Sequence, residues 1–421
     1  MIIMETERYI VLLQDQQKTS LKKVEKELEV SITSSEFLSK ENRSYEIIDQ
    51  DNGVLYKNLG ILVVDNMDEE QLKSAVKNES NPIVYYEKER EFFSADELQL
   101  ITELKKQSAG LAEKISELEK YISNKPLPQK SMVEMEWGLK AIGMERAQYT
   151  GKGVDVCILD TGLETSHPDF SSEEIEGKSF IDGEDWNRDP NGHGTHCAGI
   201  ATGNIRSDTG KRYGIAGGCN LKIAKVLSDS GRGTTSSVID AIDWAITKKF
   251  RILSLSLASP VNLNDQPSVL FETIGQRALE NNCLIIAAAG NDSNRPQIPQ
   301  PVSMPANSKS ILAVAAVDGQ MRVARFSNAG LNPSTGGNVD VCAPGVDIMS
   351  AYPKNSKNKK FFYYAMSGTS MAAPHVSGLA ALYMEQFPEK SAKEIWELIE
   401  NKARPIEGIK YRDIGNGLIQ I

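Results

Sequence analysis

Three side chains that could together activate a hydroxyl group are spread along this chain. Asp160 begins an Asp-Thr-Gly triplet, His193 lies in Gly-His-Gly-Thr-His, and Ser370 lies in Gly-Thr-Ser-Met-Ala-Ala-Pro. An alcohol is a poor nucleophile at neutral pH, so it needs an imidazole to take its proton and a carboxylate to hold that imidazole in one tautomer. The pattern therefore predicts a serine nucleophile, a histidine base and an orienting aspartate, provided that the fold brings them together.

The same motifs allow two other assignments. His196 lies three residues after His193 and competes with it as the base, although a structural histidine with a satisfied ring is its ordinary explanation. A second Asp-Thr-Gly triplet at 208–210 would suit a pair of aspartates that share one proton. That copy lies in a polar run with no buried strand before it, so we do not expect its carboxylate to be positioned for this role.

Alternating strand and helix patterns surround these motifs. Continuous apolar runs of strand length, with helices between them, predict a doubly wound parallel sheet of the α/β class. The carboxyl ends of such strands form the edge where sites are built, and Asp160 and Asn291 each follow a strand. The expected strands are 154–159, 221–227, 252–257, 284–289 and 311–317, and the expected helices include 236–248 and 269–281.

The first part of the chain predicts a smaller, separate sheet. The expected order is β-α-β-β-α-β, a ferredoxin-like α+β domain with both helices on one face. Asn66 is expected to cap the second helix. The strands are expected at 9–13, 45–48, 59–64 and 83–86, and the helices at 21–28 and 68–77.

A helical segment is predicted between these two parts. Ser94 and Glu97 form a capping box, and the apolar residues up to 124 follow the 3-4 spacing of a heptad seam. Such a helix either packs on a neighbouring domain or forms a coiled coil that makes oligomers. Prolines then mark a linker, so the predicted domains are 1–93, 94–131 and 132–421.

Composition excludes several classes of function. The chain has 421 residues and a formal net charge of −10, which argues against nucleic acid as a partner because that needs a basic patch. The apolar runs are too short for a membrane-spanning helix. The start lacks a basic end followed by an apolar core, so we expect a cytoplasmic location, with export by a route without a signal left open.

The cysteines indicate free thiols. There are five, an odd number, and none forms a CxxC pair. We therefore expect reduced thiols in a reducing compartment and no metal site.

Four stretches, in this order, resemble the subtilisin family of serine proteases: 156–162, 192–199, 287–291 and 368–374. The resemblance runs from about Trp137 to the C-terminus, and the Asp-His-Ser order is the one that this family uses. It implies a serine endopeptidase that acts on polypeptides, with Asp160, His193 and Ser370 as the triad. It also implies that the side-chain amide of Asn291 and the backbone N–H of Ser370 stabilise the oxyanion.

The resemblance also implies how substrate is held. Family members place an extended peptide between two backbone segments, here 230–233 and 256–259, which makes Gly231, Gly233, Leu257, Ala258 and Ser259 the expected substrate-binding residues. The family usually has two glycines where this chain has Ala258 and Ser259, so a narrower P1 pocket is expected. The chemistry requires no cofactor. Members of the family often bind structural calcium, but the loop 203–210 lacks the asparagines that the family usually has there, so the sequence assigns no calcium ligands.

The first domain resembles, more weakly, the inhibitor-type propeptide of the same family. Such a domain caps the helices of the protease and feeds its tail into the cleft, so the resemblance implies a self-inhibited zymogen that processes itself. Cleavage is expected near 92–94, in the linker at 126–131, or not at all. The alternative is a permanently capped binding or scaffold protein that keeps a protease fold without turnover.

Overall fold

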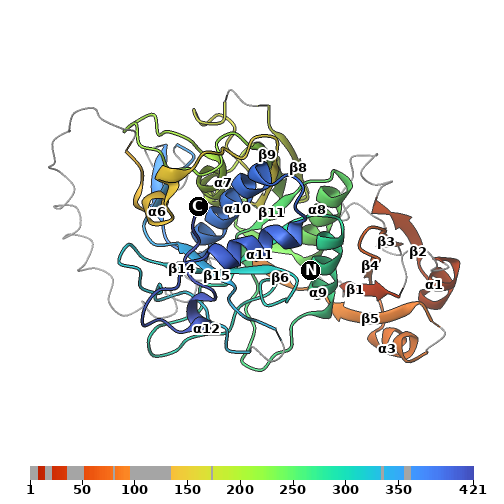
Figure 1. Ribbon diagram of the computed structural model, residues 1–421. Helices are drawn as coiled ribbons and strands as arrows, with labels where there is room; N and C mark the ends of the chain where they lie inside the picture. Colours follow the sequence, from red (N-terminus) through yellow and green to blue (C-terminus); the bar gives the residue numbers. More distant parts are fainter. Residues whose placement is uncertain are drawn as a thin grey trace, which may run out of the picture.

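The structure is a computed structural model, which describes residues 8–14, 21–35, 52–78, 81–94, 134–171, 174–332, 336–354 and 362–421. Within these residues the larger part is built on one sheet of seven parallel strands with helices packed on it (Figure 1), which confirms the predicted α/β class. The strand order is β15-β14-β13-β11-β7-β9-β8. The strands are β7 (Asp155–Asp160), β8 (Glu176–Ser179), β9 (Asn220–Lys225), β11 (Ile252–Leu255), β13 (Leu284–Ala288), β14 (Leu312–Val317) and β15 (Val341–Pro344).

The chain reverses its winding direction at β7. From there β9 and β8 lie on one side, while β11, β13, β14 and β15 follow on the other. Ligand sites in open α/β sheets form at such a reversal, beyond the carboxyl ends of the strands. Asp160 is the last residue of β7, so the fold places it at that point.

A long buried helix crosses this sheet. Helix α10 packs on β11, β13, β14 and β15 and also against α7 (Figure 1). Its residues from 369 to 384 are buried, and many of them are Ala, Gly or Ser, whose small side chains allow close packing. The helices are α6 (Trp137–Ala141), α7 (His193–Thr202), α8 (Thr235–Thr247), α9 (Val269–Glu280), α10 (Thr369–Gln386), α11 (Ala392–Lys402) and α12 (Tyr411–Ile414).

The N-terminal part forms a five-stranded sheet in the order β2-β3-β4-β1-β5, with two helices. Side chains alternate along β1: Tyr9, Val11 and Leu13 join a core of their own with the helices, whereas Ile10 and Leu12 join the core of the large domain. Both faces of this sheet are therefore buried. The elements are β1 (Arg8–Leu13), α1 (Leu21–Leu28), β2 (Ser31–Ser34), β3 (Asn52–Tyr56), β4 (Ile61–Asp65), α3 (Glu69–Lys77) and β5 (Ile83–Lys88).

Three local expectations for this part need comment. The strand expected at 45–48 lies outside the described residues, and the structure instead pairs β2 with β3 in parallel. The predicted Asn66 cap is wrong, because Asp68 accepts the backbone N–H of Glu70 at 3.1 Å and caps α3. Ser94 is the last residue of strand β6 (Glu91–Ser94), and Glu97, the other half of the predicted capping box, lies outside the described residues. The rest of the predicted heptad seam lies outside the described residues.

The N-terminal sheet packs against α8 and α9 of the large domain (Figure 1). Tyr56 donates a hydrogen bond of 2.5 Å to Asp240, and Asn58 donates one of 3.0 Å to Asp243, both on α8. At the start of α9, the Ser268 hydroxyl lies 2.9 Å from the carboxylate of Glu87. Hydrogen bonds to residues of α8 and to the start of α9 therefore surround the apolar contact between the N-terminal sheet and the large domain.

Two smaller sheets complete the described structure. One is the pair β16 (Ile348–Ala351) and β17 (Tyr363–Met366). The other has three strands, with β6 between β10 (Arg232–Thr234) and β12 (Leu257–Ala258). Among the residues that the structure describes, no helix is both long and apolar enough to cross a membrane.

Candidate active site

Asp160 and His193 form a buried pair at the end of β7. The two carboxylate oxygens of Asp160 lie 2.8 and 2.9 Å from His193 Nδ1, and each side chain is 1% exposed. Nδ1–H donates to the carboxylate in this geometry, which makes Nε2 the atom that can accept a proton. Burial alone would lower the pKa of His193, but the charge of Asp160, its hydrogen bond and the contact with Cys197 together outweigh burial and raise that pKa well above its ordinary value.

Glycines let the histidine and aspartate motifs touch. Gly192 precedes α7 with φ 90°, in the left-handed region that favours glycine. A Cβ on Gly194 would lie 2.2 Å from the carbonyl oxygen of Gly162. Because this distance is shorter than any real contact, glycine is required for the two backbones to come this close.

A second carboxylate supports the pair, and no sequence motif pointed to it. Asp189 is fully buried, and its two oxygens accept from the hydroxyls of Thr161 and Thr195 and from the backbone N–H groups of Gly192 and Thr195, at 2.7 to 2.9 Å. These bonds join the Asp-Thr-Gly turn to the first turn of α7. Asp189 thus fixes the two segments that carry Asp160 and His193.

Ser370 is the second residue of α10 and is buried. Its hydroxyl donates to the carbonyl of Ser256 at 3.2 Å, and the Ser256 hydroxyl donates to the carbonyl of Ser370 at 2.8 Å. In a regular helix that carbonyl accepts from residue 374, but Pro374 has no N–H. Pro374 lies in the second turn of α10, and the Ser256 hydroxyl replaces the missing donor.

Cys197 contacts both His193 and the backbone of Ser370. Its Sγ is 3.9 Å from His193 Nδ1 and 3.5 Å from the backbone oxygen of Ser370. Helices α7 and α10 thus bring His193 and Ser370 to the same thiol, so the three predicted catalytic residues meet in one place. Burial raises the pKa of the Cys197 thiol to about 11, so this thiol stays neutral.

Asn291 lies beside Ser370, three residues after β13. Its side-chain oxygen accepts from the backbone N–H and the hydroxyl of Thr369, at 2.9 and 2.8 Å. These bonds fix the orientation of the amide, and the amide nitrogen is then the end that can donate to a substrate oxygen. The N-terminus of α10 adds the positive end of a helix dipole at the same place.

Four of the five predicted substrate-binding residues contact β6. Ser94 donates its N–H to the Gly231 carbonyl at 3.0 Å, and the register pairs Gly233 with Phe92. On the other side, Leu257 pairs with Ser94, and Ala258 pairs with Phe93. Residues 91–94 of the chain therefore occupy the position where the resemblance places an extended peptide.

Ser259 does not join this sheet. Its backbone exchanges two hydrogen bonds with Met304, of 2.8 and 3.0 Å, on the side away from β6. The peptide bond between Met304 and Pro305 is cis.

The competing candidates have other partners. His196 is buried with Nε2 2.9 Å from the Tyr364 carbonyl, and burial lowers its pKa to about 3, so this ring stays neutral. Asp208 binds Arg206 through both oxygens, at 3.0 and 2.7 Å, whereas Asp160 binds His193. The two Asp-Thr-Gly aspartates therefore do not form a pair.

Within the described residues, one group of side chains has the types and spacing that could hold a metal ion. It consists of Asp160, His193 and Cys197, whose donor atoms lie within 4.8 Å of one another. Two of these are the proposed base and its orienting carboxylate. The cysteines elsewhere in the chain are free thiols.

Comparison with known proteins decides the family. Residues 151–417 match the family described as the subtilase family. The chain belongs to the subtilase family. Subtilisin DY of Bacillus licheniformis is 35% identical over 283 residues, which cover 67% of this chain and 94% of that protein. The major intracellular serine protease of Bacillus subtilis (strain 168) is 36% identical over 293 residues, which cover 67% of this chain and 86% of that protein.

The fold comparison agrees. The solved structure of Sphericase matches with a TM-score of 0.59 and 30% identity, and the match covers 69% of this chain and all of that one. This subtilase is therefore a serine endopeptidase that hydrolyses peptide bonds in polypeptides, and catalysis in its family needs no cofactor.

The expected cytoplasmic location is contradicted. The similar curated relatives are mostly secreted subtilisins, and the protease named as intracellular is the exception among them. The expectation rested on the first residues of the chain, and the relatives outweigh it.

Proposed function

We propose that this subtilase is made as a zymogen whose N-terminal domain inhibits it and is then removed by its own active site. The observation that carries the proposal is the position of β6, which lies as the central strand between β10 and β12. A strand held on both edges by backbone bonds blocks the place where a substrate peptide would add itself.

The geometry around Ser370 supports the following roles. The Ser370 hydroxyl attacks the scissile carbonyl while His193 Nε2 takes its proton, and Asp160 stabilises the imidazolium that forms. The amide of Asn291 and the N–H of Ser370 then hold the oxyanion. The proton on His193 finally passes to the leaving amine, and water repeats the sequence on the acyl-enzyme.

The direction of β6 indicates where the chain is cut. Ser94 is its last residue and lies opposite Leu257, and the neighbouring Ser256 bonds to Ser370. The two strands are antiparallel, so each step beyond Ser94 runs toward Ser256. We expect cleavage of the first or second bond after Ser94.

Phe92 anchors the inhibiting strand. Its side chain is fully buried, and its ring packs edge to face on Phe271 of α9, with ring centroids 5.6 Å apart. Glu89, just before the strand, accepts from the backbone N–H of Ser236 at 3.0 Å, near the N-terminus of α8. An apolar anchor and a charged bond at a helix start together hold the tail in place.

Mass spectrometry of the purified protein tests the proposal. The wild type should lose its first 94 or 95 residues, and Ser370→Ala should keep its full length. A wild type that stays full length, with no peptide hydrolysis, would instead support the alternative of a permanently capped scaffold protein.

A second measurement tests inhibition separately from cleavage. In the full-length chain a fluorophosphonate should label Ser370 slowly, because β6 fills the cleft. Phe92→Asp should speed labelling, since a buried charge would release the strand. Val84→Asp, at an exposed position of β5, is the matched control and should label like the wild type.

We also propose that the loop after α7 is held by ion pairs. In relatives a calcium ion often stabilises loops, but here the guanidinium of Arg206 lies between Asp208 and Glu136, with bonds of 2.7 Å to each. A cationic side chain already occupies the space between these carboxylates. The residues of this loop therefore do not fit a calcium ion.

A further inference from the structure

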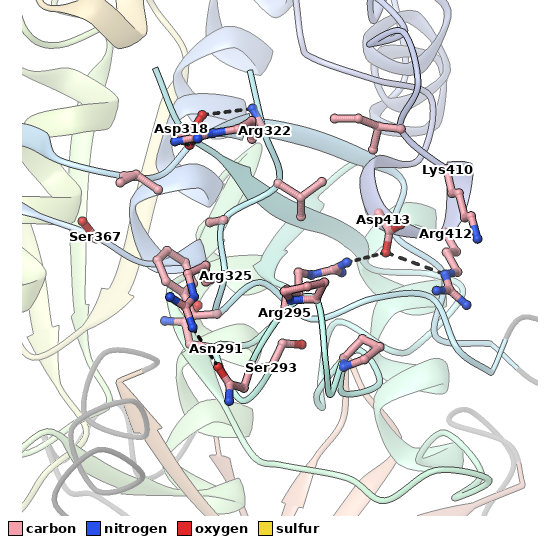
Figure 2. Close-up of a pocket in the computed structure, with 18 of the residues that line it drawn as sticks. Asn291, Ser293, Arg295, Asp318, Arg322, Arg325, Ser367, Lys410, Arg412 and Asp413 are labelled. Atoms are coloured by element: carbon pink, nitrogen blue, oxygen red, sulfur yellow. Dashed lines mark hydrogen bonds and ion pairs between the residues drawn. The ribbon is translucent and has the colours of Figure 1, made fainter. Parts of the chain in front are cut away.

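A cavity of about 1120 Å³ opens beside the catalytic serine (Figure 2). Its lining includes Asn291, which bonds to Thr369, and Ser367, which lies three residues before Ser370. No residue of β6, β10 or β12 lines it. The cavity is therefore separate from the three-stranded sheet that holds residues 91–94, and it borders the segments that carry Asn291 and Ser370.

The lining of this cavity is basic. Five cationic side chains and two carboxylates face it, which leaves a net of three positive charges. The whole protein has a formal net charge of −10, so the local charge is opposite in sign to that of the molecule. The cationic residues are Arg295, Arg322, Arg325, Lys410 and Arg412.

Both carboxylates are already paired. Asp318 lies 2.8 Å from the guanidinium of Arg322. Asp413 accepts from Arg295 at 2.7 Å and also lies 3.8 Å from Arg412, so two arginines share it (Figure 2). The carboxylates of the cavity therefore neutralise only part of its positive charge.

Arg325 and Lys410 are the cationic side chains of the cavity that no carboxylate of the described residues neutralises. Both side chains are exposed, and among the described residues no carboxylate lies within ion-pair distance of either. The Arg325 guanidinium donates a long hydrogen bond of 3.4 Å to the neutral side chain of Asn294. Figure 2 shows Lys410 extending from the segment that also carries Asp413.

We infer that this cavity binds acidic side chains in the leaving half of a peptide substrate, with Arg325 and Lys410 as their partners. The inference rests on the proposed function, because only a peptide that crosses Ser370 has a leaving half. The basic cavity would add a preference for acidic residues after the cut bond, which neither the triad nor β6 determines.

The chain itself supplies a peptide of this chemistry. The residues that follow Ser94 in the sequence are Ala95, Asp96 and Glu97. Whether the first or the second bond after Ser94 is cut, both carboxylates fall within three residues on the leaving side. A basic cavity at this place would favour self-processing and would select similar acidic sequences in other substrates.

Peptides covering residues 88–101 test the inference on the self-processed enzyme. One keeps Asp96 and Glu97, a second carries Asn and Gln there, and a third carries Lys at both positions. The value of kcat/KM, with the cut bond located by mass spectrometry, should be about 2-fold to 30-fold higher for the acidic than for the neutral peptide, as expected for two exposed charge pairs. The ratio should shrink as salt is added.

Variants assign the preference to the two residues. Arg325→Gln with Lys410→Gln should cleave the acidic and neutral peptides equally. Arg325→Glu with Lys410→Glu should prefer the lysine peptide. Lys393→Gln with Lys402→Gln removes the same charge from exposed positions on α11, and this control should keep the wild-type preference.

The outcomes separate the two proposals. Equal cleavage of all three peptides by the wild type would overturn this inference and leave the proposed function intact. A preference that survives in the double glutamine variant would also overturn it. If no peptide is cleaved at all, the proposed function fails, and this inference fails with it.

Discussion

Ser256 and Ser370 bond to each other twice, each through its hydroxyl to the backbone carbonyl of the other, at 2.8 and 3.2 Å. One of these bonds replaces the helical N–H that Pro374 lacks. A single buried serine, between β11 and β12, thus joins this part of the chain to the N-terminus of α10. The proposed nucleophile is held by a side chain 114 residues away in the sequence.

Ser256→Ala should lower stability more than its small change in volume suggests. The variant leaves the Ser370 carbonyl with the Cys197 thiol, a weak donor, as its remaining partner. A buried acceptor that loses its bond costs about 1–3 kcal/mol of unfolding free energy. Urea unfolding of the inactive Ser370→Ala protein, with and without the change, measures this cost.

A second substitution shows whether the missing bond is the cause. Pro374→Ala restores a backbone N–H at the position from which a regular helix would bond to residue 370. Ser256→Ala should therefore cost less in the Pro374→Ala background than in the wild type. Equal costs in the two backgrounds would show that the Ser256 hydroxyl has another role.

As pH falls, the activity should already be lost at a pH above 6.5, the ordinary pKa of histidine. His193 must be neutral to take the proton of Ser370, and Asp160 raises its pKa, so protonation removes the base earlier as pH falls. The dependence of kcat/KM on pH reports the pKa of this group in the free enzyme. A flat profile down to pH 5 would contradict a histidine base paired with a carboxylate.

Asp160→Asn provides the control for that assignment. The variant keeps the shape of the pair but removes the charge that raises the pKa of His193. Its kcat should fall about 10⁴-fold. The loss of its remaining activity on acidification should occur at a lower pH than in the wild type. Movement in the other direction would contradict the assigned cause.

Continuous apolar runs made the large sheet predictable. The strands around β7 are buried on both faces, so their composition alone shows them, and the catalytic motifs lie where those strands end. In β1 of the N-terminal sheet, successive residues point to opposite faces and most of them are apolar, so the sequence also shows that both faces are buried. Local pattern was sufficient for the five inner strands of the large sheet, but it missed the short strands β15 and β8 at its two edges.

Other features depend on partners far away in the chain. Strand β6 has four residues and is set by β10 and β12, which lie about 140 and 160 residues later, so nothing in its own sequence distinguishes it from the start of a helix. Asp189 lies in a polar loop, and no spacing links it to the segments that it joins. The basic cavity likewise combines cations from separate loops.

Docking of the N-terminal domain should weaken as pH rises from about 4 to 7. Burial at the contact with Tyr56 raises the pKa of Asp240 from 3.8 to about 7. The docked state therefore holds a proton that the undocked state has lost, and this contribution to docking is full below pH 4 and gone above pH 7. Each pKa unit corresponds to about 1.4 kcal/mol, so the change should be at most about 4 kcal/mol, and hydrogen exchange of β3 and β4 in full-length Ser370→Ala, corrected for intrinsic rates, measures it.

Asp240→Asn separates this titration from its neighbours. Lys178, Asp243 and Arg8 also act on the charge of Asp240, so each contributes to a pH profile. The asparagine keeps an oxygen that accepts from Tyr56 but cannot titrate. Exchange in this variant should vary much less between pH 4 and 7, and an unchanged profile would assign the effect to the other groups.

Arg206 should be worth far more to stability than an exposed arginine in a similar pair. It is 8% exposed, bonds to Asp208 and Glu136, and lies over the ring of Tyr363 with 4.9 Å between its Cζ and the ring centroid. Arg206→Ala leaves two carboxylates facing each other without their cation, which costs about 3–5 kcal/mol when such a pair is buried. Glu136 and Asp208 keep some contact with solvent, so we expect about 2–3 kcal/mol.

Arg322→Ala is the matched comparison for thermal unfolding. Arg322 also pairs with an aspartate at 2.8 Å, but its side chain is 72% exposed, so solvent screens the pair and its loss should cost less than about 1 kcal/mol. The melting temperature should therefore fall clearly for Arg206→Ala and little for Arg322→Ala. Equal shifts would mean that burial does not strengthen the Arg206 pairs, and the loop after α7 would need another source of stability.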